Sequence, residues 1–337
     1  MGWVQVCFVD VLMHSGLLLI GFVLLYFGAE WLVKGSGEIA YRVGISPLVV
    51  GLTVVAFGTS APELMVSLKA NLGASPEPDI ALGNIIGSNI CNIMLILGVG
   101  ALVRPIVVHG QIIKREVPIL LVATLVFFGM LWDGTVNRVE GGVLFAGIIF
   151  YVVASVRMAK KEPQPSQYDE AEAEQIKIVK RSGPGRVVLD LGLILIGLAG
   201  LVLGAHLLVG SGVFLAEDFG VPSAIIGLTL VAFGTSLPEL ATAVVAARRN
   251  QGDIITGAAI GSSIFNILCV IGIASLVLPL NADKVNRVDL WVMLGATVLI
   301  IPLLATRMKI SRGEGLLLLL GYVAYTVYLV VWRGVGA

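Results

Sequence analysis

The nonapeptide AFGTSAPEL, from Ala56 to Leu64, returns almost unchanged as AFGTSLPEL, from Ala232 to Leu240. Eight of the nine letters agree, and the two copies are 176 residues apart. Each copy carries a proline and a glutamate inside a stretch that is otherwise apolar enough for the interior of a membrane. Acids are costly at that depth and usually mark a functional site. The repeat therefore predicts both how the chain is organised and where its site lies.

The composition is that of an integral membrane protein. Of the 337 residues, 57% are hydrophobic and 13% are charged, about half the charged fraction of soluble domains. Apolar runs of about 20 residues recur, each long enough to cross a bilayer as a helix. We predict an all-α, multi-pass protein of the plasma membrane, embedded in the lipid bilayer, with no cofactor and no obligate protein partner. A net charge of zero without a basic tract argues against nucleic acid as a partner.

Apolar runs predict ten transmembrane helices in two groups of five. The first five-helix repeat occupies residues 1–159, a polar cytoplasmic linker 160–185, and the second five-helix repeat 186–337. The ten spans are expected at 15–33, 46–70, 79–103, 115–132, 139–158, 187–209, 221–247, 252–279, 288–306 and 314–332.

Lysine and arginine placement predicts the orientation. With the N-terminus outside, 17 of the 22 basic residues fall on the cytoplasmic side and five outside, which is the bias expected of membrane proteins. Both termini are then outside and the linker is inside. Because each half has five spans, the second half enters the membrane from the opposite side, so the two repeats are inverted.

The internal match extends beyond the nonapeptides. GLTVVAFGTSAPEL, from Gly51, parallels GLTLVAFGTSLPEL, from Gly227, and GNIIGSNICNI, from Gly83, parallels GAAIGSSIFNI, from Gly257. Inverted repeats with interrupted helices are typical of transporters, which bind substrate near the bilayer midplane at the repeat interface.

The nonapeptides carry the ligands of a hard cation. Proline lacks an N–H, so Pro62 and Pro238 leave the carbonyls of Gly58 and Gly234 without their helical donors. Hydroxyl and carboxylate oxygens stand beside these carbonyls, and such oxygens suit Ca²⁺ or Na⁺ rather than thiophilic metals. The side chains concerned are Thr59, Ser60, Glu63, Thr235, Ser236 and Glu239.

The third and eighth spans supply further candidates. Ser88 and Asn92 are four residues apart, as are Ser262 and Asn266, so each pair shares one face of a helix. Two other interpretations stay open: the serines could bond to their own helix, and the asparagines could join neighbouring helices.

The charge of the two glutamates predicts exchange rather than one-way transport. Together they carry −2, which one Ca²⁺ or two Na⁺ would match. Leaving the pair empty is costly, because like charges repel strongly at low dielectric. Only an ion-loaded site would then reorient easily across the membrane. Glu30 and His206 occupy matching positions in the first and sixth spans, and we expect both near the membrane interface rather than at the ions.

Paired GTSxPE segments followed by GS…N helices resemble the α-repeats of the sodium/calcium exchanger family, within the cation/Ca²⁺ exchanger superfamily. The resemblance covers nearly the whole chain and implies that the first and sixth helices slide across an eight-helix core. It implies Ca²⁺ ligation by Glu63 and Glu239 with the backbone oxygens of Thr59 and Thr235. It further implies Na⁺ sites formed by Ser60, Ser88, Ser236, Ser262 and the carbonyls of Ala56 and Ala232. The usual coupling in the family, three Na⁺ against one Ca²⁺, would be electrogenic.

One departure from the family pattern bears on the coupling ion. Many relatives, including potassium-dependent ones, have aspartate where this chain has Asn266, so the chain resembles the potassium-independent branch. The GNxxE pattern usual in proton/calcium exchangers is absent here, which argues against H⁺ as the coupling ion.

Three other functions stay open at this point. One is exchange of H⁺ for Ca²⁺ or for another divalent ion, and another is a passive channel, although interrupted inverted repeats favour a carrier. The third is an intramembrane hydrolase with Ser60 or Ser236 as nucleophile. It would need a nearby base, and His206 is the only candidate, so we predict that the protein is not an enzyme.

Overall fold

The computed structural model describes residues 8–43, 47–72, 76–159, 185–218, 232–282 and 285–333, and these are almost entirely helical. Within these ranges, nine segments are long and apolar enough to cross a membrane. The remaining expected span, 221–247, is described only from Ala232, and the predicted linker lies almost wholly outside the described residues. The nine are Asp10–Arg42, Leu48–Leu72, Pro78–Val103, Ile112–Asp133, Arg138–Met158, Arg186–Asp218, Gly252–Val277, Arg287–Ala305 and Arg312–Val331.

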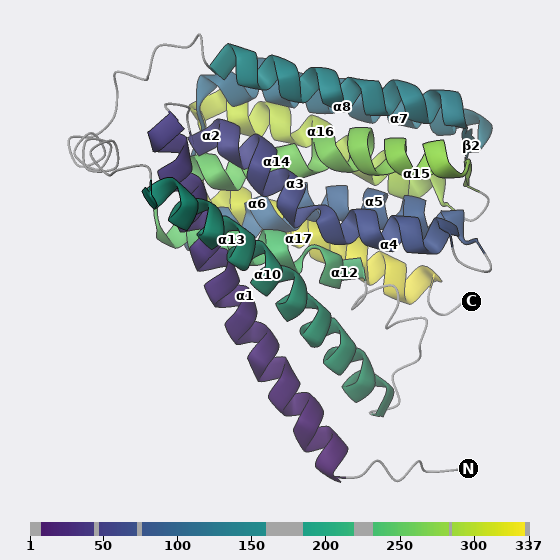
Figure 1. Ribbon diagram of the computed structural model, residues 1–337. Helices are drawn as coiled ribbons and strands as arrows, with labels where there is room; N and C mark the ends of the chain where they lie inside the picture. The colour runs from purple at the N-terminus through teal and green to yellow at the C-terminus, as the bar shows by residue number, and fades with distance from the viewer. Residues whose placement is uncertain are drawn as a thin grey trace.

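Two helices are far longer than the others. α1 (Phe8–Val43) and α10 (Gly185–Asp218) have 36 and 34 residues. They pack against each other along much of their length and run obliquely past the other helices, extending beyond them (Figure 1). The predicted spans, 15–33 and 187–209, were too short, because an apolar run marks only the apolar part of a helix. Beyond that part, polar partners continue the pair: Arg42 of α1 forms a buried ion pair with Asp190 of α10 at 3.0 Å.

Glycines bring the backbones of α1 and α10 together. A Cβ added at Gly28 would lie 2.8 Å from the carbonyl oxygen of Gly197, and one added at Gly204 would lie 2.8 Å from that of Gly21. Gly197 and Gly204 follow Gly21 and Gly28 by the same 176 residues that separate the nonapeptides. The same close contact therefore occurs twice, with the roles of the two helices exchanged.

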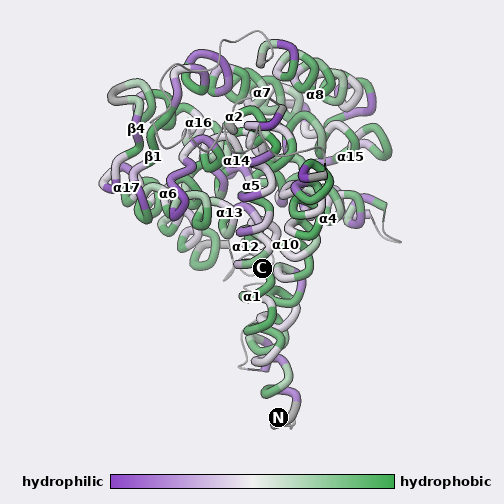
Figure 2. Tube along the Cα trace, turned by 60° about the vertical axis from the view of Figure 1, so that its left-hand side comes forward, coloured by the Kyte–Doolittle hydropathy of each residue, from purple (hydrophilic) through white to green (hydrophobic). Residues whose placement is uncertain are grey.

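The remaining helices form a bundle around two central segments. The segment α5–η2–α6 and the segment α14–η6–α15 are the most buried of the spans. Around them, the outer helices expose leucine, valine and phenylalanine side chains, as expected for lipid contact. Figure 2 shows hydrophobic residues over most of the trace and hydrophilic stretches within α5 and α14. The elements are α2 (Pro47–Val50), η1 (Gly51–Val55), α3 (Ala56–Thr59), α4 (Ala61–Leu72), α5 (Pro78–Ile90), η2 (Cys91–Ile96), α6 (Leu97–Val103), η3 (Ile112–Glu116), α7 (Val117–Met130), η4 (Leu131–Asp133), α8 (Arg138–Ala159), α12 (Ala232–Thr235), α13 (Leu237–Arg248), α14 (Gly252–Phe265), η6 (Asn266–Ile271), α15 (Gly272–Val277), α16 (Arg287–Arg307), α17 (Arg312–Tyr328) and η7 (Leu329–Arg333).

Two short antiparallel ladders join loops of the bundle. β1 (Ile106–Val107) pairs with β4 (Lys309–Ile310), and β2 (Thr135–Val136) pairs with β3 (Leu280–Asn281). In the first ladder Ile106 is opposite Ile310, and in the second Leu280 is opposite Val136. Both partners are related by 174 residues, so the two ladders have equivalent registers.

Candidate ion-binding site

Both nonapeptides break their helices at the serine. α3 ends at Thr59 and α4 begins at Ala61, while α12 ends at Thr235 and α13 begins at Leu237. Ser60 has φ −81° and ψ 2°, and Ser236 has φ −90° and ψ 6°, which lies outside the helical region. Pro62 and Pro238 stand in the first turns of α4 and α13, where proline is tolerated. The interruption predicted from the two prolines is therefore present in both copies.

The facing helices change to π-helix at the two asparagines. η2 covers Cys91–Ile96 and contains Asn92, and η6 covers Asn266–Ile271 and starts with the other amide. π-Helical turns are rare and often occur at functional sites. The sequence gave no signal for them beyond a polar residue within an apolar helix.

The broken and π-helical segments bring the predicted side chains together. The Thr59 and Ser262 hydroxyl oxygens are 3.4 Å apart, and Ser262 donates to the Ala56 carbonyl at 3.4 Å. Thr59 also lies close to Glu239, while Ser88 and Thr235 lie close to Glu63. Each glutamate is thus faced by the threonine of the other half. Ala232 holds the corresponding place at the start of α12, and the ten predicted polar side chains are all buried.

Many oxygens in this cluster have no hydrogen-bond partner. Both carboxylate oxygens of Glu239 and one of Glu63 are buried without one. The other such atoms here are the hydroxyls of Ser60, Ser88 and Ser236 and the amide oxygens of Asn92 and Asn266. Buried polar atoms without a partner are costly and rare. A convergent group of acceptor oxygens fits a desolvated hard cation.

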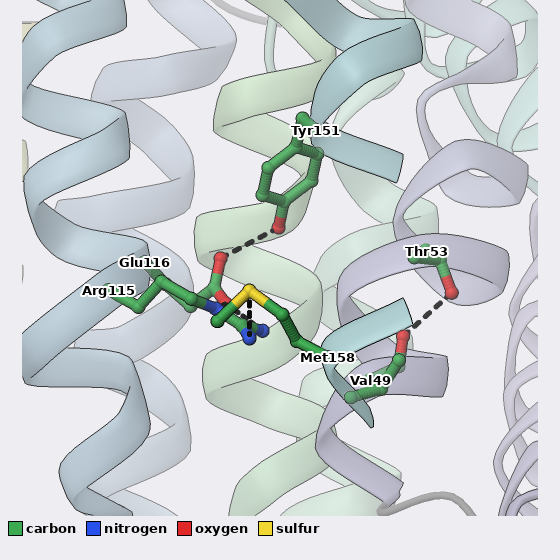
Figure 3. A network of polar contacts seen from close by, with 6 residues as sticks. All are labelled: Val49, Thr53, Arg115, Glu116, Tyr151 and Met158. Atoms are coloured by element: carbon green, nitrogen blue, oxygen red, sulfur yellow. Dashed lines mark hydrogen bonds and ion pairs between the residues drawn. The ribbon is translucent and has the colours of Figure 1, made fainter. Parts of the chain in front are cut away.

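Other buried acids in the described part of the chain have partners. Glu116 accepts from the Arg115 guanidinium at 2.6 Å and from the Tyr151 hydroxyl at 2.9 Å, as Figure 3 shows. Asp190 pairs with Arg42, and Asp289 accepts from Tyr325 at 3.0 Å. Neither Glu63 nor Glu239 forms an ion pair with any described residue. These two carboxylates are therefore left for a cation that comes from outside the protein.

The sequence matches one family model along both halves. The sodium/calcium exchanger protein model matches residues 13–157 and 189–331. The chain belongs to this family. Membership in a family of exchangers places the protein among transporters rather than enzymes.

Individual relatives match the exchanger over nearly its whole length. The sodium/calcium exchanger MaX1 of Methanosarcina acetivorans is 33% identical over 93% of this chain and 97% of its own. The putative antiporter CaxA of Alkalimonas amylolytica is 38% identical over 91% of this chain and 95% of its own. A solved structure of the sodium-calcium exchanger NCX_Mj, soaked with 10 mM Na⁺ and no Ca²⁺, superposes with a TM-score of 0.81 at 35% identity. The alignment covers 95% of this chain and 99% of that one, so the fold is the membrane exchanger fold.

The geometry of the exchanger bears on the two interpretations left open for serine and asparagine. Ser262 turns toward Thr59 and Ala56 rather than bonding to its own helix. The Asn266 nitrogen donates to the Asn89 carbonyl oxygen at 3.0 Å, and the Asn92 nitrogen donates to Ser263 at 3.5 Å. The amides therefore do join helices, but through nitrogen, and their oxygens stay without partners.

Glu30 and His206 lie apart from this cluster. Glu30 forms an ion pair with Arg249, which follows α13, and His206 is exposed on α10.

Two residues near the carboxylates were missed by sequence reasoning. Asn84 on α5 contacts residues of both nonapeptides. Cys91 is buried close to Ser236 and within range of both glutamates. An amide or a thiol in an apolar span is too common in packing roles to have been singled out, and only the fold places these two beside the site.

Proposed function

We propose that the protein exchanges Na⁺ for Ca²⁺ across the membrane by alternating access. One observation carries this proposal: Glu63 and Glu239 are buried together with free carboxylate oxygens and no cationic side chain. A charge of −2 in that environment must be matched by one Ca²⁺ or by two or more Na⁺. Binding of the two ions is then mutually exclusive, which makes exchange the expected mode.

We assign the ligands by position in the two repeats. Ca²⁺ is held by the Glu63 and Glu239 carboxylates with the backbone oxygens of Thr59 and Thr235. The Na⁺ ions use the remaining oxygens, those of Ser60, Ser88, Asn92, Ser236, Ser262 and Asn266 and the carbonyls of Ala56 and Ala232. The unpartnered oxygens of the serines and asparagines support this assignment.

The coupling we propose is three Na⁺ per Ca²⁺, without K⁺. Three Na⁺ against one Ca²⁺ moves one net charge per cycle, so transport is electrogenic. With amides at both positions 92 and 266 the site holds two carboxylates, and no third one calls for an additional K⁺. Such a site suits the potassium-independent mode.

The proposed topology is ten helices in two inverted five-helix repeats, with both termini outside. Residues 1–159 form the first repeat, 160–185 the cytoplasmic linker and 186–337 the second repeat. The reciprocal glycine contacts of α1 and α10 and the equivalent ladders support two-fold related halves. We place the protein in the plasma membrane, with the lipid bilayer and the transported ions as its partners.

Alternating access is assigned to the α1–α10 pair. Both helices lie against the broken motifs: an added Cβ at Gly58 would meet Leu198 of α10, and one at Gly234 would meet Val209 of the same helix. Sliding of the pair would uncover one side of the site and cover the other. The partly exposed ion pair between Glu30 and Arg249 joins α1 to the end of α13, and it would have to break or follow during that movement.

The test is Ca²⁺ uptake into proteoliposomes loaded with Na⁺ and diluted into a buffer without Na⁺ or K⁺, with a proton ionophore present. We expect uptake that requires internal Na⁺ and survives the ionophore. Uptake driven only by an imposed pH gradient would overturn Na⁺ coupling and assign H⁺ instead. Flux without any gradient of a counter-ion would indicate a channel.

A further inference from the structure

Asn84 connects the two halves of the site. It lies on α5, one helical turn before Ser88, and its side chain is partly buried. The amide nitrogen donates to the Glu63 backbone carbonyl at 3.3 Å and to the Ser67 hydroxyl at 3.2 Å. The amide oxygen accepts from the Thr235 hydroxyl at 3.3 Å. Because a carbonyl can only accept, the contact with Glu63 fixes which end of the amide faces which neighbour.

The other half of the molecule has no such residue. The repeat spacing matches Asn84 to Ala258 and Ser67 to Ala243, and alanine cannot make these hydrogen bonds. Thr59, the counterpart of Thr235, donates instead to the Val55 carbonyl of its own helical segment at 3.0 Å. The two threonines are therefore oriented differently, one within its own repeat and the other by a residue of the opposite repeat.

The hydrogen bond to Asn84 determines what the Thr235 hydroxyl can offer the site. A hydroxyl has one proton and two lone pairs. When the proton goes to the Asn84 oxygen, the lone pairs remain for a cation beside Glu63, which lies close to Thr235. The same amide holds the backbone at Glu63, so one side chain fixes both members of this half of the site.

We propose that Asn84 is a positioning residue for ion binding, which sets the geometry of Thr235 relative to Glu63. This inference rests on the proposed function, since it concerns the same cations. Asn84 is not itself assigned as an ion ligand. Its contribution is a hydrogen bond between the repeats that exists in one half of the site and has no equivalent in the other.

The test compares Asn84→Ala with Ser67→Ala as a matched control. Both remove contacts between α4 and α5, but Ser67→Ala leaves the bonds to Glu63 and Thr235 in place. We expect Asn84→Ala to raise the Ca²⁺ concentration for half-maximal uptake about tenfold, the scale of one or two lost hydrogen bonds. The maximal rate should stay within about twofold, and Ser67→Ala should shift neither value by more than about twofold. Equal shifts in the two variants, or a fall in maximal rate alone, would refute positioning.

A double-mutant cycle with Thr235→Val separates positioning from general damage. If Asn84 acts through Thr235, removing the amide in the Thr235→Val background should add less than about twofold to the affinity loss. Fully additive losses would show that Asn84 acts by another route. Asn84→Ser, too short to reach Thr235, should behave like Asn84→Ala and covers the case in which the alanine variant does not fold.

The same cycle is measured as Ca²⁺-dependent stabilisation of the detergent-purified protein, followed by melting temperature. This readout needs binding but no Na⁺ gradient. If the unmodified protein fails to couple Ca²⁺ uptake to Na⁺, the proposed function is wrong while the binding cycle still tests Asn84. If uptake is coupled but the cycle is additive, the positioning role alone is wrong.

Discussion

The hydroxyl oxygens of Thr59 and Ser262 lie 3.4 Å apart, although 203 residues separate them in the chain. Each belongs to a different half, and each stands beside atoms assigned to the ions. This contact shows that the site is assembled from both repeats and that neither half could form it alone. Changes in either half should therefore affect the same binding event.

Removing either carboxylate should abolish exchange without unfolding the protein. For Glu63→Gln and Glu239→Gln we expect Na⁺-driven Ca²⁺ uptake to fall to background. In ion-free buffer both variants should melt at or above the temperature of the unmodified protein, because an unpaired buried charge is gone. The stabilisation normally given by added Ca²⁺ should be lost. Glu77→Gln, the same change at an exposed acid, is the control, and sustained uptake in both site variants would refute the assignment.

A methyl group between α1 and α10 should destabilise their contact. In Gly28→Ala the new Cβ would lie 2.8 Å from backbone atoms of α10, and such overpacking costs about 1–3 kcal/mol. Gly16→Ala lies on the same helix with no described atom within 4 Å of its Cβ. There alanine should instead stabilise by roughly 0.5–1 kcal/mol, through its helix propensity. Melting temperatures in detergent measure both, and equal effects would contradict the packing argument.

Loss of Arg42 should leave Asp190 as an uncompensated buried charge. Arg42→Gln is expected to destabilise the protein by about 3–5 kcal/mol, as for other broken buried pairs. Adding Asp190→Asn removes the remaining charge and should recover most of the loss. Arg104→Gln, at an exposed arginine, serves as the control in the same thermal melts. A double variant as unstable as Arg42→Gln would show that the ion pair itself is not the cause.

A carboxylate at position 266 should make uptake dependent on pH. The Asn266 nitrogen donates to the Asn89 amide oxygen, and an ionised aspartate cannot donate. Asn266→Asp should therefore lose uptake at high pH and regain it as falling pH protonates the new acid, which can then donate.

Asn92→Asp is the matched control for that change. Its partner is the Ser263 hydroxyl, which can turn and donate to a carboxylate. We expect a smaller loss and a weaker pH dependence in uptake measured between pH 6 and 9. Identical pH profiles for the two variants would contradict the explanation through the hydrogen-bond partner.

Sequence reasoning found the residues of the site because their cost in a membrane is visible in the letters. Glu63, Glu239 and the two prolines stand out against apolar surroundings, and the repeat shows that they occur in pairs. The breaks at Ser60 and Ser236 followed from proline chemistry alone.

Other features depend on contacts that no local pattern encodes. The π-helical turn at Asn266 and the link from Asn84 to Thr235 both require a neighbouring helix from a distant part of the chain. The full lengths of α1 and α10 depend on partners such as Arg42 and Asp190, which hydropathy does not register. A buried acid with a partner, such as Glu116, also looks like any other glutamate until its arginine is placed.

The ladder of β1 and β4 has a consequence for biosynthesis. Ile106 leaves the ribosome about 200 residues before its partner Ile310. At roughly 5–20 residues per second that is a delay on the order of 10–40 seconds. Glu63 waits almost as long for Ser262. A newly inserted first half therefore resides in the bilayer with an unmatched acid and an open edge, and the quality-control machinery of the cell meets that half-made exchanger in every round of synthesis.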